Sequence, residues 1–152
     1  MFAAVKKYAV FSGRARRQEF WLFVLLYSIL SIISIIAGFW YVGSQVVDMA
    51  ASNATVSMTE DQMAGAMAGL VAAYGLALII WVAPQILLFL PYLGVSIRRL
   101  HDTDRSGWWF LIVLVPLIGP IWFLVLTFLD GTIGDNRFGP DPKGRAGPSP
   151  TD

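Results

Sequence analysis

The sequence contains no cysteine and a single histidine, His101, among its 152 residues. Without cysteine the chain has no disulfide bond, no thiolate nucleophile and no zinc site of the zinc-finger type. Transition-metal sites usually combine several imidazole or thiolate ligands, so one histidine argues against such a site. We therefore expect neither a metal ion nor another cofactor.

Charge is also scarce. Charged residues make up 14% of the chain and hydrophobic residues 57%, whereas about a quarter of a soluble domain is charged. The formal net charge is only +1, which gives no global field that would attract nucleic acid. These figures predict a membrane protein that does not bind nucleic acid.

Three long runs lack any charged side chain: residues 20–47, 62–97 and 110–129. About 20 apolar residues are enough for a helix to cross the hydrocarbon core of a bilayer. The runs predict an all-α, multi-pass membrane protein with three spans, at about 20–43, 72–97 and 108–129. The third run carries a Pro-Leu-Ile-Gly-Pro sequence at 116–120. It is therefore either one kinked crossing or a re-entrant hairpin that returns to the side it entered from.

The remaining segments complete a single transmembrane domain over residues 1–142. Ser12 is a suitable N-cap, which predicts an N-terminal interfacial helix from about Gly13 with Arg14, Arg17, Gln18 and Trp21 on one face. Residues 48–63 are polar, contain no base and are expected to form an external loop. The Gly- and Pro-rich residues 143–152 are expected to be a disordered tail.

The distribution of bases predicts the orientation. The segment before the first run and the loop at 98–109 carry eight Lys and Arg residues, whereas residues 48–63 carry none. The positive-inside rule then predicts a cytoplasmic N-terminus and a cytoplasmic 98–109 loop. Three crossings would put the C-terminus outside and a hairpin would keep it inside, so its side is left open.

The 98–109 loop holds the most concentrated polar chemistry in the chain and allows three interpretations. Arg98 and Arg99 could be anchors that snorkel to the headgroups, with nearby Asp residues as partners and caps. Arginines could instead form a site for lipid headgroups or phosphate, because guanidinium binds phosphate in a bidentate way. Third, His101 could act as a base oriented by an aspartate. The candidate lipid or phosphate ligands are Arg14, Arg17, Arg98, Arg99 and Arg105, and a polar cluster comprises His101, Asp102, Asp104, Asn136 and Arg137.

Three stretches taken together resemble the YhaH-type family of small bacterial inner-membrane proteins. They are residues 11–21 (FSGRARRQEFW), 98–108 (RRLHDTDRSGW) and 134–142 (GDNRFGPDP), in the order in which the family has them. The resemblance implies a multi-pass protein of the bacterial inner (plasma) membrane. It brings no catalytic residues, since the family has no assigned activity.

The functional expectation is a non-enzymatic inner-membrane protein whose cytoplasmic arginines bind anionic lipid headgroups or a protein partner. The partner would be another membrane protein or a second copy of the chain. The alternative is a membrane-embedded enzyme or carrier that handles a lipid-linked or phosphorylated substrate with the loop at 98–104.

Overall fold

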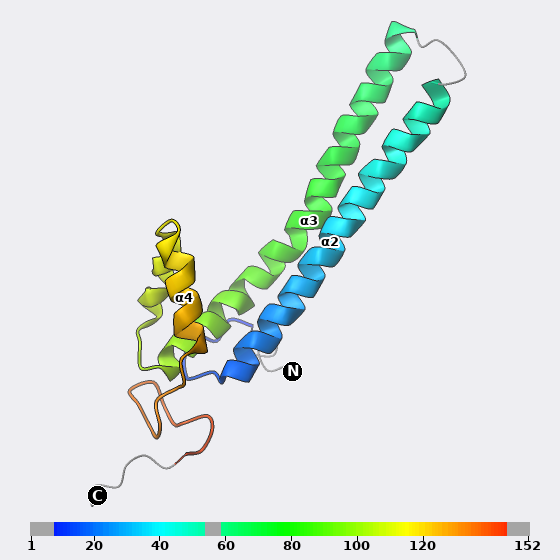
Figure 1. The fold of residues 1–152 in the computed structure, drawn as a ribbon. Helices are drawn as coiled ribbons and strands as arrows, with labels where there is room; N and C mark the ends of the chain where they lie inside the picture. The colour runs from blue at the N-terminus through cyan, green and yellow to red at the C-terminus, as the bar shows by residue number, and fades with distance from the viewer. Residues whose placement is uncertain (1–7, 54–58, 146–152) are drawn as a thin grey trace, which may run out of the picture. The chain divides into compact units, whose positions relative to one another are not determined.

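Helices account for most of the described chain (Figure 1). The computed structural model describes residues 8–53 and 59–145. In chain order the elements are α2 (Arg17–Asn53), α3 (Glu60–Asp102), the 3-10 helix η1 (Gly107–Leu114) and α4 (Ile118–Phe128). Within the described ranges there is no strand, only one isolated bridge between Asn136 and Gly139. The predicted all-α fold is confirmed.

Two of these helices, α2 and α3, are long and apolar enough to cross a membrane. In the most apolar window of each, only 17% and 6% of the residues are buried inside the protein. A core helix of a soluble protein would be mostly buried, so these side chains require an apolar solvent around them. The predicted spans 20–43 and 72–97 fall within α2 and α3.

The start of α2 differs from the prediction. The expected interfacial helix from about Gly13, capped by Ser12, is not formed, and α2 begins at Arg17. Gly13 has a φ of +84°, and the N–H of Ala15 donates to the carbonyl of Arg98 at 3.0 Å. These long-range contacts hold the backbone before Arg17 out of the helical conformation.

The predicted external loop is also shorter than expected. Helix α2 continues to Asn53 and α3 begins at Glu60, so most of residues 48–63 is helical. Thr59 and Gln62 form a capping box, in which the Gln62 N–H donates to Thr59 Oγ1 and the Thr59 N–H donates to Gln62 Oε1. This reciprocal pair satisfies two free backbone donors and makes a helix start possible in a polar stretch.

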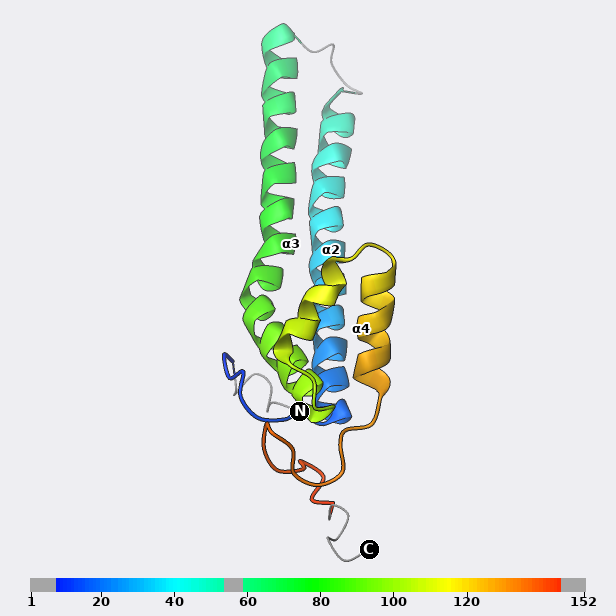
Figure 2. The ribbon, with the colours of Figure 1, turned by 90° about the vertical axis from the view of Figure 1, so that its left-hand side faces the viewer.

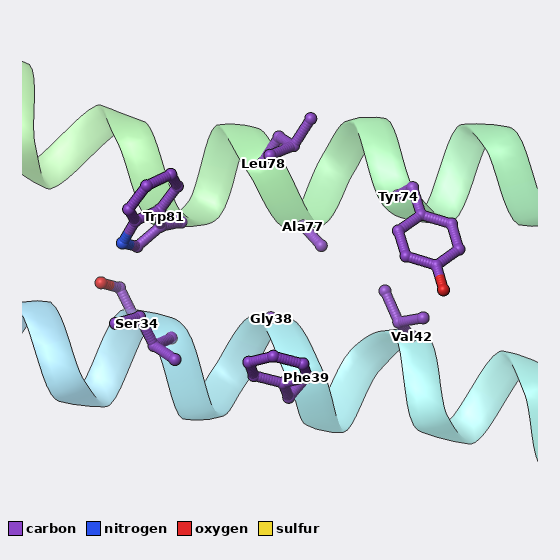
Figure 3. Close-up of a pocket in the computed structure, with 9 residues that line it drawn as sticks. Ser34, Gly38, Phe39, Val42, Tyr74, Ala77, Leu78 and Trp81 are labelled. Atoms are coloured by element: carbon purple, nitrogen blue, oxygen red, sulfur yellow. The ribbon is translucent and has the colours of Figure 1, made fainter.

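The chain divides into two units, Tyr27–Leu87 and Met1–Leu26 with Leu88–Asp152. In the first, α2 and α3 pack closely where Gly38 faces Ala77 (Figure 3). A Cβ added at Gly38 would lie 3.5 Å from the Ala77 carbonyl oxygen. Tyr74 and Trp81 extend from α3 toward α2 on either side of that contact, along an apolar groove of about 410 Å³. Gln85 Nε2 also donates to Ser31 Oγ at 3.1 Å.

The third apolar run folds back on itself instead of forming one continuous helix. The segment η1 is followed by a turn and by α4, and the two short helices lie side by side (Figure 2). Gly119 packs directly on the carbonyl of Ile112, and the rings of Phe110 and Phe123 meet edge to face at 5.5 Å. The 11 residues of α4 span about 16 Å, roughly half of the hydrocarbon core. The geometry is that of the re-entrant hairpin, not of the single crossing at 108–129.

Proline explains why the run breaks. Pro116 has no N–H to donate, and Leu117 adopts a φ of +65° at the turn before α4. The exposed side chains at this turn are apolar, and they include Leu114, Val115, Leu117 and Ile118. In the same unit the buried apolar residues are Ala15, Phe20, Phe23, Val95, Leu100, Phe123 and Leu126.

Candidate functional site

The three polar stretches of the sequence meet in one cluster, which we call the polar cap (residues 13–19, 98–105 and 130–145). Arg14 is at its centre. Its Nε donates to Asp102 Oδ1 at 3.0 Å, Nη1 to the Gly134 carbonyl at 2.7 Å and Nη2 to the Thr132 carbonyl at 2.6 Å. The buried guanidinium group of Arg14 therefore contacts residues that lie 88 to 120 positions further along the chain.

Asp102 is shared by two arginines. Arg99 Nη1 donates to Asp102 Oδ2 at 2.7 Å, while Arg14 holds the other carboxylate oxygen. Arg99 also donates to the carbonyls of Thr127 and Leu129, at the end of α4. Asp102 is only 2% exposed, and the two cations around it exceed its charge by one. The carbonyl dipoles that accept from both guanidinium groups offset that excess.

Arg98 is buried as well, on a different side of α3. Its Nη1 donates to Glu19 Oε1 at 2.8 Å and its Nε to the Gly94 carbonyl at 3.3 Å. Its Nη2 is buried and finds no hydrogen-bond partner among residues 8–53 and 59–145. The side chain is 1% exposed, so neither Arg98 nor Arg99 is a snorkelling anchor.

His101 links the end of α3 to residues 130–145, the segment after α4 that is called the tail from here on. Its Nδ1 is 3.2 Å from the Gly13 carbonyl, and its ring stacks on Phe138 with centroids 3.9 Å apart. A carbonyl only accepts, so Nδ1 carries the proton and Nε2 is the acceptor in the neutral ring. Asn136 Nδ2 donates to the His101 carbonyl at 2.9 Å, and Arg137 lies 4.8 Å from the Phe138 centroid.

The predicted polar cluster is thus brought together, but with structural roles. Arg137 pairs with Asp104 at 3.2 Å on the surface. The Asn136 side chain also accepts from the Phe138 N–H, which closes the turn around Asn136 and Gly139. Both oxygens of Asp102 are engaged by arginine, so this carboxylate does not orient the imidazole of His101.

Acidic residues of the tail form a second set of contacts that the sequence analysis did not anticipate. Asp130 accepts from Lys143 at 2.6 Å and pairs with Arg17 at 2.9 Å, and Arg145 binds Asp141 at 2.7 Å. The hydrogen bond from Lys143 lowers the pKa of Asp130, and that from Arg145 lowers the pKa of Asp141 to about 2. The sequence did offer a signal for the role of Asp130, because this acidic residue directly follows the last apolar run.

These contacts revise the predicted disorder at the C-terminus. Lys143 and Arg145 belong to the polar cap and not to a disordered tail. Residues 146–152, which complete the predicted tail, lie outside the described residues.

The arginines predicted to bind lipid fall into two groups. Arg14, Arg98 and Arg99 converge as expected, but protein atoms enclose their guanidinium groups, so they are not open to a headgroup. Arg17 is partly exposed beside Asp130. Arg105 is half-buried, and its side chain donates one long hydrogen bond of 3.4 Å to the Thr103 carbonyl. Of the predicted set, Arg17 and Arg105 are the two whose side chains the described residues leave partly exposed to a ligand.

A cleft of about 420 Å³ lies beside His101, between the end of α3 and η1. Its other lining residues are mostly apolar: Leu93, Ile97, Trp108, Phe110 and Leu111, together with Ser106 and Gly107. Within the described ranges no group of three His, Asp or Glu residues is arranged to hold a metal ion.

Comparison with known proteins adds the family. The family described as "protein of unknown function (DUF805)" matches residues 8–140. Inner membrane protein YhaH of Escherichia coli K12 is 39% identical over 139 residues, which cover 91% of this chain and 92% of the relative. Inner membrane protein YhaI of the same strain is 38% identical over 142 residues, 93% of this chain and 92% of the relative.

No solved structure was found to match the chain. The family match spans the first two stretches of the cap, the third as far as residue 140, and both long apolar helices. The chain therefore belongs to the DUF805 family and is an integral membrane protein.

Proposed function

We propose that this chain is an inner-membrane protein with two crossings and both ends in the cytoplasm, and that its polar cap binds anionic lipid headgroups without catalysing a reaction. The observation that carries the proposal is the Arg14 contact set. Arg14 binds Asp102 at the end of α3 and carbonyls of the tail, so these three segments must lie on the same side of the membrane.

The lengths of the helices support this topology. With α2 and α3 as the crossings and the η1–α4 hairpin returning to its own side, the number of crossings is even. Bases are abundant in the cap and lacking in residues 48–63, which supports a cytoplasmic cap. The relatives YhaH and YhaI are named inner membrane proteins, which supports that membrane for this chain.

The charge of the cap supports binding to anionic headgroups. Residues 8–26 and 88–145 contain nine Arg and Lys residues against six Asp and Glu residues. Three of the arginines are enclosed, so the lipid would meet the exposed Arg16 and Arg137 and the partly exposed Arg17 and Arg105. Trp108 and Trp109 are exposed next to Arg105, as expected of an aromatic belt at the headgroup level.

The same contacts speak against catalysis by Asp102. A general base or a metal ligand needs a free oxygen, and both oxygens of Asp102 accept from arginine. The alternative of a carrier or enzyme for a lipid-linked substrate rests on the cleft beside His101, which is the one feature that favours it.

Lipid-dependent stabilisation tests the proposal. The purified full chain in neutral detergent is titrated with anionic or zwitterionic phospholipid, and the thermal unfolding midpoint is followed at low and high salt. We expect the anionic lipid to stabilise more strongly, and high salt to remove the difference.

The Arg17→Gln, Arg105→Gln double variant should weaken the apparent affinity for anionic lipid about tenfold. Each base near the membrane surface contributes about 1 kcal/mol of attraction to anionic lipid, and Arg17 contributes less because it is paired with Asp130. Asp61→Asn, which removes an exposed charge from the other unit, is the matched control and should leave the affinity unchanged. Equal stabilisation of the wild type by both lipids would refute the proposal.

A further inference from the structure

The cleft beside His101 has the properties of a site for a single lipid molecule. Leu93, Ile97 and Leu111 give it apolar walls, and its volume of about 420 Å³ lies within the usual range for ligand pockets, about 300–1,000 Å³. It opens next to Trp108, which is 79% exposed. An apolar cleft that opens at the aromatic belt faces acyl chains and headgroups, not bulk water.

His101 lines this cleft and carries a hydrogen-bond acceptor. Its Nδ1–H is committed to the Gly13 carbonyl, so the neutral ring has its lone pair at Nε2. No hydrogen bond from the described residues reaches Nε2. A ligand next to His101 must therefore supply a donor, such as a hydroxyl group.

Ser106 lines the cleft and Arg105 precedes it in the chain, so both can offer donors to a ligand that extends out of the cleft. Ser106 lines the cleft, and its Oγ accepts from the Trp108 N–H, which leaves the hydroxyl proton free to donate. Arg105 immediately precedes Ser106 and uses one side-chain nitrogen for a single long hydrogen bond to the Thr103 carbonyl. The remaining guanidinium donors suit a phosphate, which they can bind in a bidentate way.

We propose that this cleft holds one acyl chain of an anionic glycerophospholipid whose headgroup carries a hydroxyl. The chain lies against Ile97 and Leu111, the phosphate is bound by Arg105, and the hydroxyl donates to Nε2 of His101. Phosphatidylglycerol has this chemistry. The inference rests on the proposed function, because it names the place and the lipid class within the general attraction of the cap for anionic headgroups.

Native mass spectrometry of the full chain in detergent tests the assignment, with apparent affinities measured for three lipids of matched acyl chains. Phosphatidylglycerol offers a singly charged phosphodiester and hydroxyls, phosphatidylmethanol offers the same phosphodiester without a hydroxyl, and phosphatidylcholine is zwitterionic and has no donor. We expect affinity to fall in that order, with one phosphatidylglycerol bound at least tenfold more tightly than phosphatidylcholine.

Two variants isolate the cleft. Leu111→Trp fills it and should lower phosphatidylglycerol affinity at least fivefold, whereas Leu114→Trp is the matched control, because Leu114 is 77% exposed on the same helix and does not line the cleft. His101→Asn keeps a donor for the Gly13 carbonyl but removes the Nε2 acceptor. It should reduce phosphatidylglycerol affinity to the level of phosphatidylmethanol, and His101→Gln should retain part of the difference between these two lipids.

The outcomes separate the two proposals. If the wild type does not prefer either anionic lipid over phosphatidylcholine, the proposed function fails and this inference fails with it. If the anionic preference is present but is insensitive to Leu111→Trp and His101→Asn, the cleft is not the site and the proposed function stands. Should His101→Asn unfold, the comparison of Leu111→Trp with Leu114→Trp still decides the question.

Discussion

One carboxylate faces two guanidinium groups at the centre of the polar cap. Asp102 accepts from Arg14 and from Arg99 through different oxygens, and all three side chains are almost fully buried. Burying a charge is costly unless it is paired and its remaining donors are bonded. The carbonyls of Thr132, Gly134 and Thr127 accept the remaining hydrogen bonds of the two guanidinium groups. The cap is therefore stable only when residues 13–19, the end of α3 and residues 130–145 come together.

Replacement of Asp102 tests this arrangement. Asp102→Asn removes the carboxylate that Arg14 and Arg99 share and leaves Arg14 the longer contact with Asp141 at 3.8 Å, so we expect a loss of about 3–5 kcal/mol in the free energy of unfolding. Thermal or denaturant unfolding in detergent measures it. Asp104→Asn is the control, since its pair with Arg137 is exposed and is worth about 0–1 kcal/mol. Similar losses in the two variants would mean that burial does not set the cost.

The Asp141 carboxylate predicts how the tail contacts depend on pH. Arg145 lowers the pKa of Asp141 from its ordinary 3.8 to about 2 in the folded protein. The folded state therefore favours the ionised form, and this stabilisation is complete above the ordinary value and is lost as pH falls from 3.8 through about 2. We expect Asp141→Asn to lower the unfolding midpoint at pH 6 and to have a much smaller effect at pH 2, where the carboxyl of the folded protein is about half protonated. A constant difference at both values would contradict the assignment.

Among the secondary-structure elements, the η1–α4 hairpin decides the most about the molecule. An apolar run of membrane length became two short helices because Pro116 interrupts hydrogen bonding and Gly119 lets the second helix return against the first. A Cβ at position 119 would overlap the backbone carbonyl of Ile112, so relieving the overlap would require the backbone of η1 or α4 to shift.

Gly119→Ala should therefore open or strain the hairpin. We expect destabilisation of about 1–3 kcal/mol, as for overpacked sites, measured as a lowered unfolding midpoint in detergent. Gly43→Ala is the matched control, because a Cβ there has no neighbour within 4 Å and alanine favours the helix. A neutral result for Gly119→Ala would argue against the close packing of η1 and α4.

For the whole molecule, the hairpin and the cap together predict the side of the C-terminus. At the C-terminus, after Asp152, a reporter that works only in the cytoplasm should be active. Between residues 56 and 57, a reporter that works only outside the cytoplasm should be active. Parallel fusions that are active in one compartment each provide the reading. A periplasmic signal from the C-terminal fusion would contradict the two-crossing topology and the Arg14 contacts with the tail.

Composition and charge distribution alone identified the class of protein. Apolar runs of membrane length have no stable place in water, so residues 20–47 and 62–97 had to become helices in a lipid environment. The three polar stretches likewise indicated the family before any geometry was known. These conclusions depend on local properties, which the order of residues expresses directly.

Only the tertiary structure decided what the polar residues do. From the sequence, Arg14, Arg98 and Arg99 look like exposed bases for lipid, because nothing local reveals that Asp102, Glu19 and the tail carbonyls enclose them. The helix expected from Gly13 is absent for the same reason, because the N–H of Ala15 donates to the Arg98 carbonyl instead. Contacts between residues far apart in the chain outweigh local preference, and their free energies appear only when the segments are packed together.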